Sequence, residues 1–139
     1  MRLPDDTKIL IIEDDPGHAR LIEIFLVEAG FSNERIVLGR GDEAADLLFE
    51  EGKFKGHPRP RPMVVFLDLN LPGLHGYSLL ERMREKGVAE EMPVIVITSS
   101  ADPDERNRAI TKGADAFIAK PPSAQAIRDT FARLGLLAN

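Results

Sequence analysis

The sequence predicts an α/β fold in which a five-stranded parallel sheet carries helices on both faces. Short, continuous apolar runs rich in β-branched residues recur along the chain, and such runs are typical of parallel strands buried on both faces. Between these runs lie stretches whose apolar residues recur at helical spacing. Because the two patterns alternate along the chain, we expect parallel pairing through right-handed helical crossovers.

In chain order, the predicted strands are Lys8–Ile12, Arg35–Leu38, Met63–Leu67, Val94–Thr98 and Ala116–Ala119. The predicted helices are marked by apolar residues within 19–29, 44–48, 79–83, 106–111 and 127–134. Asp15, Asp102 and Ser123 stand where N-caps are expected, because short polar side chains accept hydrogen bonds from free backbone N–H groups. Gly30 and Gly113 follow the first and fourth helices, where glycine commonly ends a helix. These signals support one helix after each strand.

Length and composition indicate a single soluble domain, and we expect residues 1–139 to form one unit. With 43% hydrophobic residues the chain can bury a core without disulfides, and it has no cysteine for a disulfide or a thiolate metal site. It shows no secretory signal and no apolar run of membrane-spanning length, so a cytoplasmic location is expected. The net charge of −5 argues against direct binding of nucleic acid.

Polar side chains stand at the carboxyl ends of four predicted strands. Glu13 and Asp14 follow the first strand, and Asp68 follows the third. Thr98 ends the fourth strand, and Lys120 follows the fifth. Ligands bind outside the carboxyl ends of the strands in parallel α/β sheets. If the central strands are neighbours, these side chains should therefore converge on one site.

The charges at this expected site do not balance. Glu13, Asp14 and Asp68 with the single Lys120 would leave two net negative charges. Crowded carboxylates raise one another's pKa, and a divalent cation would neutralise them. A site whose ligand atoms are all oxygens favours Mg²⁺. Taken alone, Lys120 is consistent with an ordinary surface lysine, but the whole set favours a magnesium site.

Four segments together resemble the receiver domain of bacterial two-component response regulators. They are residues 9–15, 67–76, 93–99 and 113–121. The resemblance covers essentially the whole chain and implies a flavodoxin-like fold with strand order 2-1-3-4-5. The long loop before the third strand and the run Asp-Leu-Asn-Leu-Pro at 68–72 are similar to stand-alone, chemotaxis-type regulators paired with phytochrome-type histidine kinases.

The resemblance implies the chemistry of the strand ends. Asp68 would be the phosphoryl acceptor. Asp14 would bind Mg²⁺ directly and Glu13 through water, with Asp68 and the backbone carbonyl of Asn70 completing the protein ligands. The acceptor would take its phosphoryl group from a sensor histidine kinase or a histidine phosphotransfer protein. The chain would be a signalling protein rather than an enzyme, with slow self-dephosphorylation.

The resemblance also implies a switch. Lys120 would pair with Asp68 and then with a phosphoryl oxygen, and a cis peptide before Pro121 would point Lys120 inward. Thr98 would donate its hydroxyl to the phosphoryl group, and Phe117 would fill the space that Thr98 vacates. The surface of the fourth helix, fifth strand and fifth helix would then change shape. The alternative for Phe117 is a plain core aromatic.

Two other functions are alternatives to a phosphoryl-accepting receiver domain. A Mg²⁺-dependent phosphohydrolase with an aspartate nucleophile would need a second aspartate two residues after Asp68, where the chain has Asn70. A receiver-shaped binding module that is never phosphorylated would not need the full set of strand-end residues. A P-loop enzyme is excluded, because the sequence has no Gly-Lys-Ser/Thr loop.

Two segments leave alternatives open. Lys53–Pro62 is basic and proline-rich, which favours a stiff solvated loop, and a docking patch for an acidic partner is the alternative. The apolar residues 134–138 would either pack on the sheet or contribute to a homodimer surface.

Overall fold

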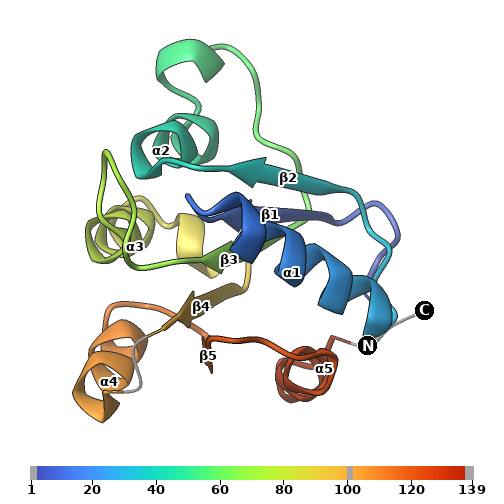
Figure 1. Cartoon of the computed structure of the whole chain (residues 1–139). Coiled ribbons are helices and arrows are strands. Elements are labelled where there is room, and N and C mark those ends of the chain that lie inside the picture. The colour runs from blue at the N-terminus through green and yellow to red at the C-terminus, as the bar shows by residue number, and fades with distance from the viewer. Residues whose placement is uncertain (1–2, 100–101, 137–139) are drawn as a thin grey trace.

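The computed structural model describes residues 3–99 and 102–136 and has the predicted architecture, a parallel sheet between two layers of helices (Figure 1). The strands are β1 (Lys8–Ile12), β2 (Arg35–Leu38), β3 (Met63–Leu67), β4 (Val94–Thr98) and β5 (Ala116–Ala119). They pair in the order β2-β1-β3-β4-β5, and every pairing is parallel. The predicted strands and the predicted strand order are confirmed.

A helix follows each strand. The helices are α1 (Pro16–Glu28), α2 (Gly41–Phe49), α3 (Gly76–Glu85), α4 (Pro103–Thr111) and α5 (Ala124–Arg133), with short 3₁₀ turns η1 (Gly52–Phe54) and η2 (Val88–Glu90). In Figure 1, α1 and α5 cover one face of the sheet, and α2, α3 and α4 cover the other. None of the helices in the described ranges has both the length and the apolar character needed to cross a membrane.

The alternation of side chains along each strand divides the core into two layers. Ile9 and Ile11 of β1 pack with the α1 and α5 side, and Leu10 and Ile12 pack with the α2 and α3 side. Every residue of β3 is buried, as expected for a central strand covered on both faces. The sheet is therefore held rigidly where its strands end.

Helix caps fix the chain just beyond the strand ends. The Asp15 carboxylate accepts hydrogen bonds from the backbone N–H groups of Gly17 (2.8 Å) and His18 (3.1 Å), so Asp15 caps α1 as predicted. The other two predicted caps, Asp102 of α4 and Ser123 of α5, are confirmed in the same way. Glu13 and Asp14 thus lie between the end of β1 and the capped start of α1.

Most of the proline-rich loop is exposed, as predicted for a solvated loop, but Arg59 anchors it to the protein. Arg59 is buried, its guanidinium donates to the backbone carbonyl of Leu48 (3.1 Å), and it forms an ion pair with Glu91. This anchor could not be predicted from the sequence, because a buried arginine in a loop is recognised only by its tertiary partners. At the other end of the chain, Leu134 and Leu136 pack against the core, whereas residues 137–138 of the same apolar run lie outside the described residues.

Gly76 permits a close approach between α3 and the loop that carries Asp68. A Cβ atom at Gly76 would lie 2.6 Å from Leu69 Cα and 2.7 Å from the Asp68 carbonyl oxygen. The Gly76 N–H also donates to the Leu69 carbonyl at 3.0 Å. Both atoms that a side chain would meet belong to the backbone, so the loop itself would have to shift.

Gly76→Ala is therefore expected to lower the free energy of unfolding by about 1–3 kcal/mol, the usual range for forcing extra atoms into a packed site. Urea unfolding followed by circular dichroism measures the change. Gly39→Ala is the matched control, because a Cβ atom there would meet nothing closer than 3.8 Å. Equal losses in the two variants would contradict the close-packing explanation.

Candidate functional site

The register of β1 and β3 places two carboxylates side by side. Ile12 pairs with Leu67, so Glu13 and Asp68 emerge from neighbouring strands at the same level. The Asp68 N–H donates to the Ile12 carbonyl at 3.0 Å, which extends the ladder into the site. Glu13 and Asp68 are only 2% and 4% exposed, whereas Asp14 faces solvent.

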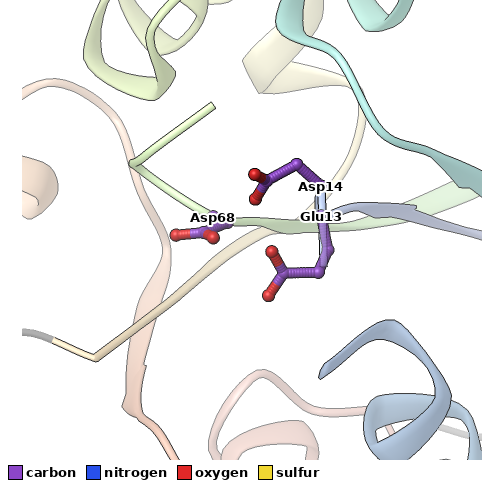
Figure 2. Close-up of side chains that lie close together, drawn as sticks. All are labelled: Glu13, Asp14 and Asp68. Atoms are coloured by element: carbon purple, nitrogen blue, oxygen red, sulfur yellow. The ribbon is translucent and has the colours of Figure 1, made fainter. Parts of the chain in front are cut away.

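Asp14 completes an acidic cluster at this edge. One carboxylate oxygen from each of Glu13, Asp14 and Asp68 lies within 4.8 Å of the other two. Figure 2 shows the three side chains turned toward a common space beyond the ends of β1 and β3. Three carboxylate oxygens at this separation could hold a hard divalent cation.

Lys120 faces two of these carboxylates. The register between β4 and β5 pairs Thr98 with Ala119, and the Lys120 N–H donates to the Thr98 carbonyl at 2.8 Å. The ammonium group of Lys120 contacts the Glu13 carboxylate and lies 3.2 Å from Asp68 Oδ2. Its side chain is only 10% exposed. The peptide between Lys120 and Pro121 is cis, as the resemblance implied.

The crowding has an electrostatic consequence for Glu13. Burial raises the pKa of Glu13 to about 7, and the neighbouring Asp68 carboxylate acts in the same direction, whereas Lys120 opposes both. Burial alone would lower the pKa of Lys120, but its hydrogen bond to Glu13 and the charge of Asp68 raise it above its ordinary value. The lysine therefore stays charged, and the carboxylates remain under-neutralised.

The remaining predicted site residues lie around this cluster. Thr98 is fully buried at the end of β4. Phe117 on β5 is partly buried and packs against the α2 and α3 side of the core. Asn70 lies in the loop after β3, and its backbone N–H donates to Asp68 Oδ1 at 3.2 Å. The roles expected for the Asn70 carbonyl, the Thr98 hydroxyl and Phe117 stay predictions.

His18, for which the sequence motifs indicate no role, lies at the site. His18 Nδ1 lies 3.1 Å from Lys120 Nζ and 3.5 Å from Glu13 Oε1. The only available signal was its position three residues after the Asp15 cap, on the first turn of α1. That position alone does not show that the ring reaches the end of β5.

The arrangement has the parts of a phosphoryl-accepting site. A buried carboxylate, Asp68, is oriented by a backbone N–H and a lysine ammonium. The acidic neighbours can hold a cation that neutralises charge on a transferring group. An aspartate-based phosphohydrolase would need a second aspartate two residues after Asp68, and the chain has Asn70 at that position.

Comparison with known proteins agrees with this geometry. The response regulator receiver domain family matches residues 9–132. The phosphate regulon transcriptional regulatory protein PhoB of Rhizobium meliloti is 33% identical over 114 residues, which are 82% of this chain and 45% of PhoB. Response regulator Rcp1 of Synechocystis is 32% identical over 97 residues, 70% of this chain and 65% of Rcp1. The chain thus spans less than half the length of PhoB and just under two thirds of Rcp1.

Solved structures show the same fold. The bacteriophytochrome response regulator AtBRR is 30% identical with a TM-score of 0.81, and the match covers 98% of this chain and 97% of AtBRR. The Mn²⁺-bound form of Rcp1 is 25% identical with a TM-score of 0.76, covering 91% and 92% of the two chains. The resemblance drawn from the sequence motifs is confirmed, and the chain belongs to the response regulator receiver domain family.

Proposed function

We propose that Asp68 accepts a phosphoryl group from a phosphohistidine in a Mg²⁺-dependent reaction, and that the chain thereby acts as a single-domain response regulator. One observation carries the proposal. A buried carboxylate at the end of the central strand lies beside two further acids and a charged lysine. This set of groups suits the transfer of a phosphoryl group more than it suits a structural ion pair.

The chemistry needs few groups. A carboxylate oxygen of Asp68 attacks phosphorus, the P–N bond of the phosphohistidine breaks, and the imidazole leaves with the electron pair. Lys120 stands 3.2 Å from the Asp68 carboxylate, where its ammonium can next contact a phosphoryl oxygen. Water later hydrolyses the acyl phosphate and returns Asp68 as a carboxylate with inorganic phosphate. Slow self-dephosphorylation is therefore part of the proposal.

Mg²⁺ fits the site because its donors are all oxygens and their charge exceeds that of Lys120. Glu13, Asp14 and Asp68 would hold the ion together with the backbone carbonyl of Asn70. When bound, it would supply positive charge against the oxygens of the transferring group. The raised pKa of Glu13 is consistent with this assignment, since burial and the Asp68 carboxylate both disfavour its charged form and a bound cation would favour that form. The Mn²⁺-bound form of Rcp1 gives a relative with a related ion.

The expected switch would run through the looser half of the molecule. Helix α4 buries only Ala109, whereas the first helix buries Ala19, Ile22 and Leu26. Attraction of the Thr98 hydroxyl to the phosphoryl group would free space beside β4 for Phe117. The surface formed by α4, β5 and α5 would then change, because α4 has the least apolar contact to lose.

The partners follow from the same proposal. A phosphohistidine donor means a sensor histidine kinase or a histidine phosphotransfer protein. The similarity to bacteriophytochrome response regulators such as AtBRR supports a phytochrome-type kinase. The homodimer, the cytoplasmic location and a docking role for the proline-rich loop stay predictions.

Incubation with acetyl phosphate and Mg²⁺ is expected to add the mass of one phosphoryl group, because a small acyl phosphate can replace the protein donor. Intact-protein mass spectrometry measures the gain. EDTA and, separately, Asp68→Ala should each abolish it. Unchanged labelling in Asp68→Ala would refute the assignment of the acceptor, and a complete lack of labelling, also with a histidine kinase, would favour the binding module.

Asp68→Asn is expected to stabilise the metal-free protein by about 1 kcal/mol, the equivalent of roughly one pKa unit of repulsion. The gain should grow as the pH rises from 5 to 8. The pKa of Glu13 is 4.5 in the unfolded chain and about 7 in the folded protein, so between these values the folded state binds more protons. The stability of the wild type therefore falls as the pH rises through this range, and part of that loss is repulsion between Glu13 and Asp68, which Asp68→Asn removes. Mg²⁺ should favour the wild type and remove the gain.

Urea unfolding in EDTA and in Mg²⁺, at pH 5 and at pH 8, measures these differences. Asp6→Asn, at an exposed acid before β1 and so at the opposite edge of the sheet from the cluster, is the matched control for removing one negative charge. A clear loss of stability for Asp68→Asn in EDTA at pH 8 would show that the Lys120 ion pair outweighs carboxylate repulsion.

A further inference from the structure

The ammonium group of Lys120 has three protons to donate, and three acceptors surround it. Two are the carboxylates of Glu13 and Asp68. The third is the imidazole Nδ1 of His18 at 3.1 Å. We propose that His18 is a positioning residue that holds the Lys120 ammonium and thereby sets how fast Asp68 gains and loses its phosphoryl group. This inference rests on the proposed function of Asp68.

The chemistry of the pair determines the form of the ring. A lysine ammonium can only donate, so Nδ1 must accept, and the contact requires a neutral imidazole with its proton on Nε2. His18 Nε2 lies 3.9 Å from Asp15 Oδ2, so that proton faces a carboxylate. The other oxygen of Asp15 is fixed by capping α1. At 3.9 Å the contact between the ring and Asp15 is electrostatic rather than a hydrogen bond, and it favours a proton on Nε2 over one on Nδ1.

The surroundings favour this hydrogen bond. His18 lines an apolar recess of about 280 Å³ with Leu21, Pro121 and Pro122, and Lys120 also borders it. The ring itself is 49% exposed, but the lysine behind it is 10% exposed. Apolar neighbours limit the water that could replace Nδ1 as the third acceptor, and a hydrogen bond is stronger where water is scarce.

The third acceptor matters because the other two are carboxylates. Lys120 has to turn from Asp68 to a phosphoryl oxygen when the acyl phosphate forms. Without His18, the Lys120 ammonium would be drawn only toward Glu13 and Asp68, and its position over the reacting oxygen would be less defined. Groups that are held in place before the reaction need no rearrangement during it. Loss of His18 should therefore slow phosphorylation and dephosphorylation together.

Two substitutions separate hydrogen bonding from packing. Asn places its carbonyl oxygen near the position of Nδ1 and can accept from Lys120, whereas Leu fills similar space and cannot accept. With saturating acetyl phosphate and Mg²⁺, His18→Leu is expected to lower both rate constants about three- to tenfold, the effect of one modest hydrogen bond. His18→Asn should retain most of each rate. His57→Leu, at an exposed histidine of the proline-rich loop, is the control and should change neither.

A second measurement does not depend on phosphorylation. Nitrogen-15 spectra of the wild-type protein should show His18 protonated at Nε2 and bare at Nδ1, and the Lys120 ammonium protected from solvent exchange. The ammonium protection should be lost in His18→Leu and retained in His18→Asn. Equal rates for the Leu and Asn variants, or a proton on Nδ1, would overturn the role of His18. If wild-type protein takes up no phosphoryl group, the proposed function fails, and the spectra still decide whether His18 holds Lys120.

Discussion

Three carboxylates crowd the carboxyl edge of the sheet, and a single ammonium group faces them. Their repulsion persists because β1 and β3 are packed on both faces and cannot separate to relieve it. Burial is the main cause of the raised pKa of Glu13, and the neighbouring Asp68 carboxylate adds to it. A site of this kind gains stability from any partner that adds positive charge. Binding of a divalent cation, as proposed above, would relieve that constraint directly, and the added charge of a phosphoryl group on Asp68 would make such a cation more necessary.

The molecule also has an uneven distribution of packing around the site. The acids follow the central strands, of which β3 is buried along its whole length and β1 from Ile9 to Ile12. Lys120 and Thr98 stand on the β4 and β5 side, next to α4 with its single buried residue. A change of charge at Asp68 cannot move the acids far, so its effects should pass to the side that has less contact to lose. His18 bridges these two halves, because it reaches from α1 to the end of β5.

The strand bounds and the main site residues could be predicted because each depends on a short, local pattern. Apolar runs of five residues or fewer define the strands, and the residue after each run must lie at the carboxyl edge. The contact of His18 with Lys120 could not be predicted in this way. It depends on how α1 lies relative to the β5–α5 loop, and packing rather than sequence spacing fixes that distance. Arg59 was missed for a similar reason, since its partners Leu48 and Glu91 lie on other elements.

The most direct test of the central claim is to identify the side chain that carries the phosphoryl group. Borohydride reduces an aspartyl phosphate to the alcohol, so the acceptor aspartate becomes homoserine and is located by tandem mass spectrometry. After treatment with acetyl phosphate and Mg²⁺, we expect homoserine at position 68 and unreduced acids at positions 13 and 14. Homoserine at another acidic residue, with position 68 unchanged, would show that the carboxylate at the end of β3 is not the acceptor.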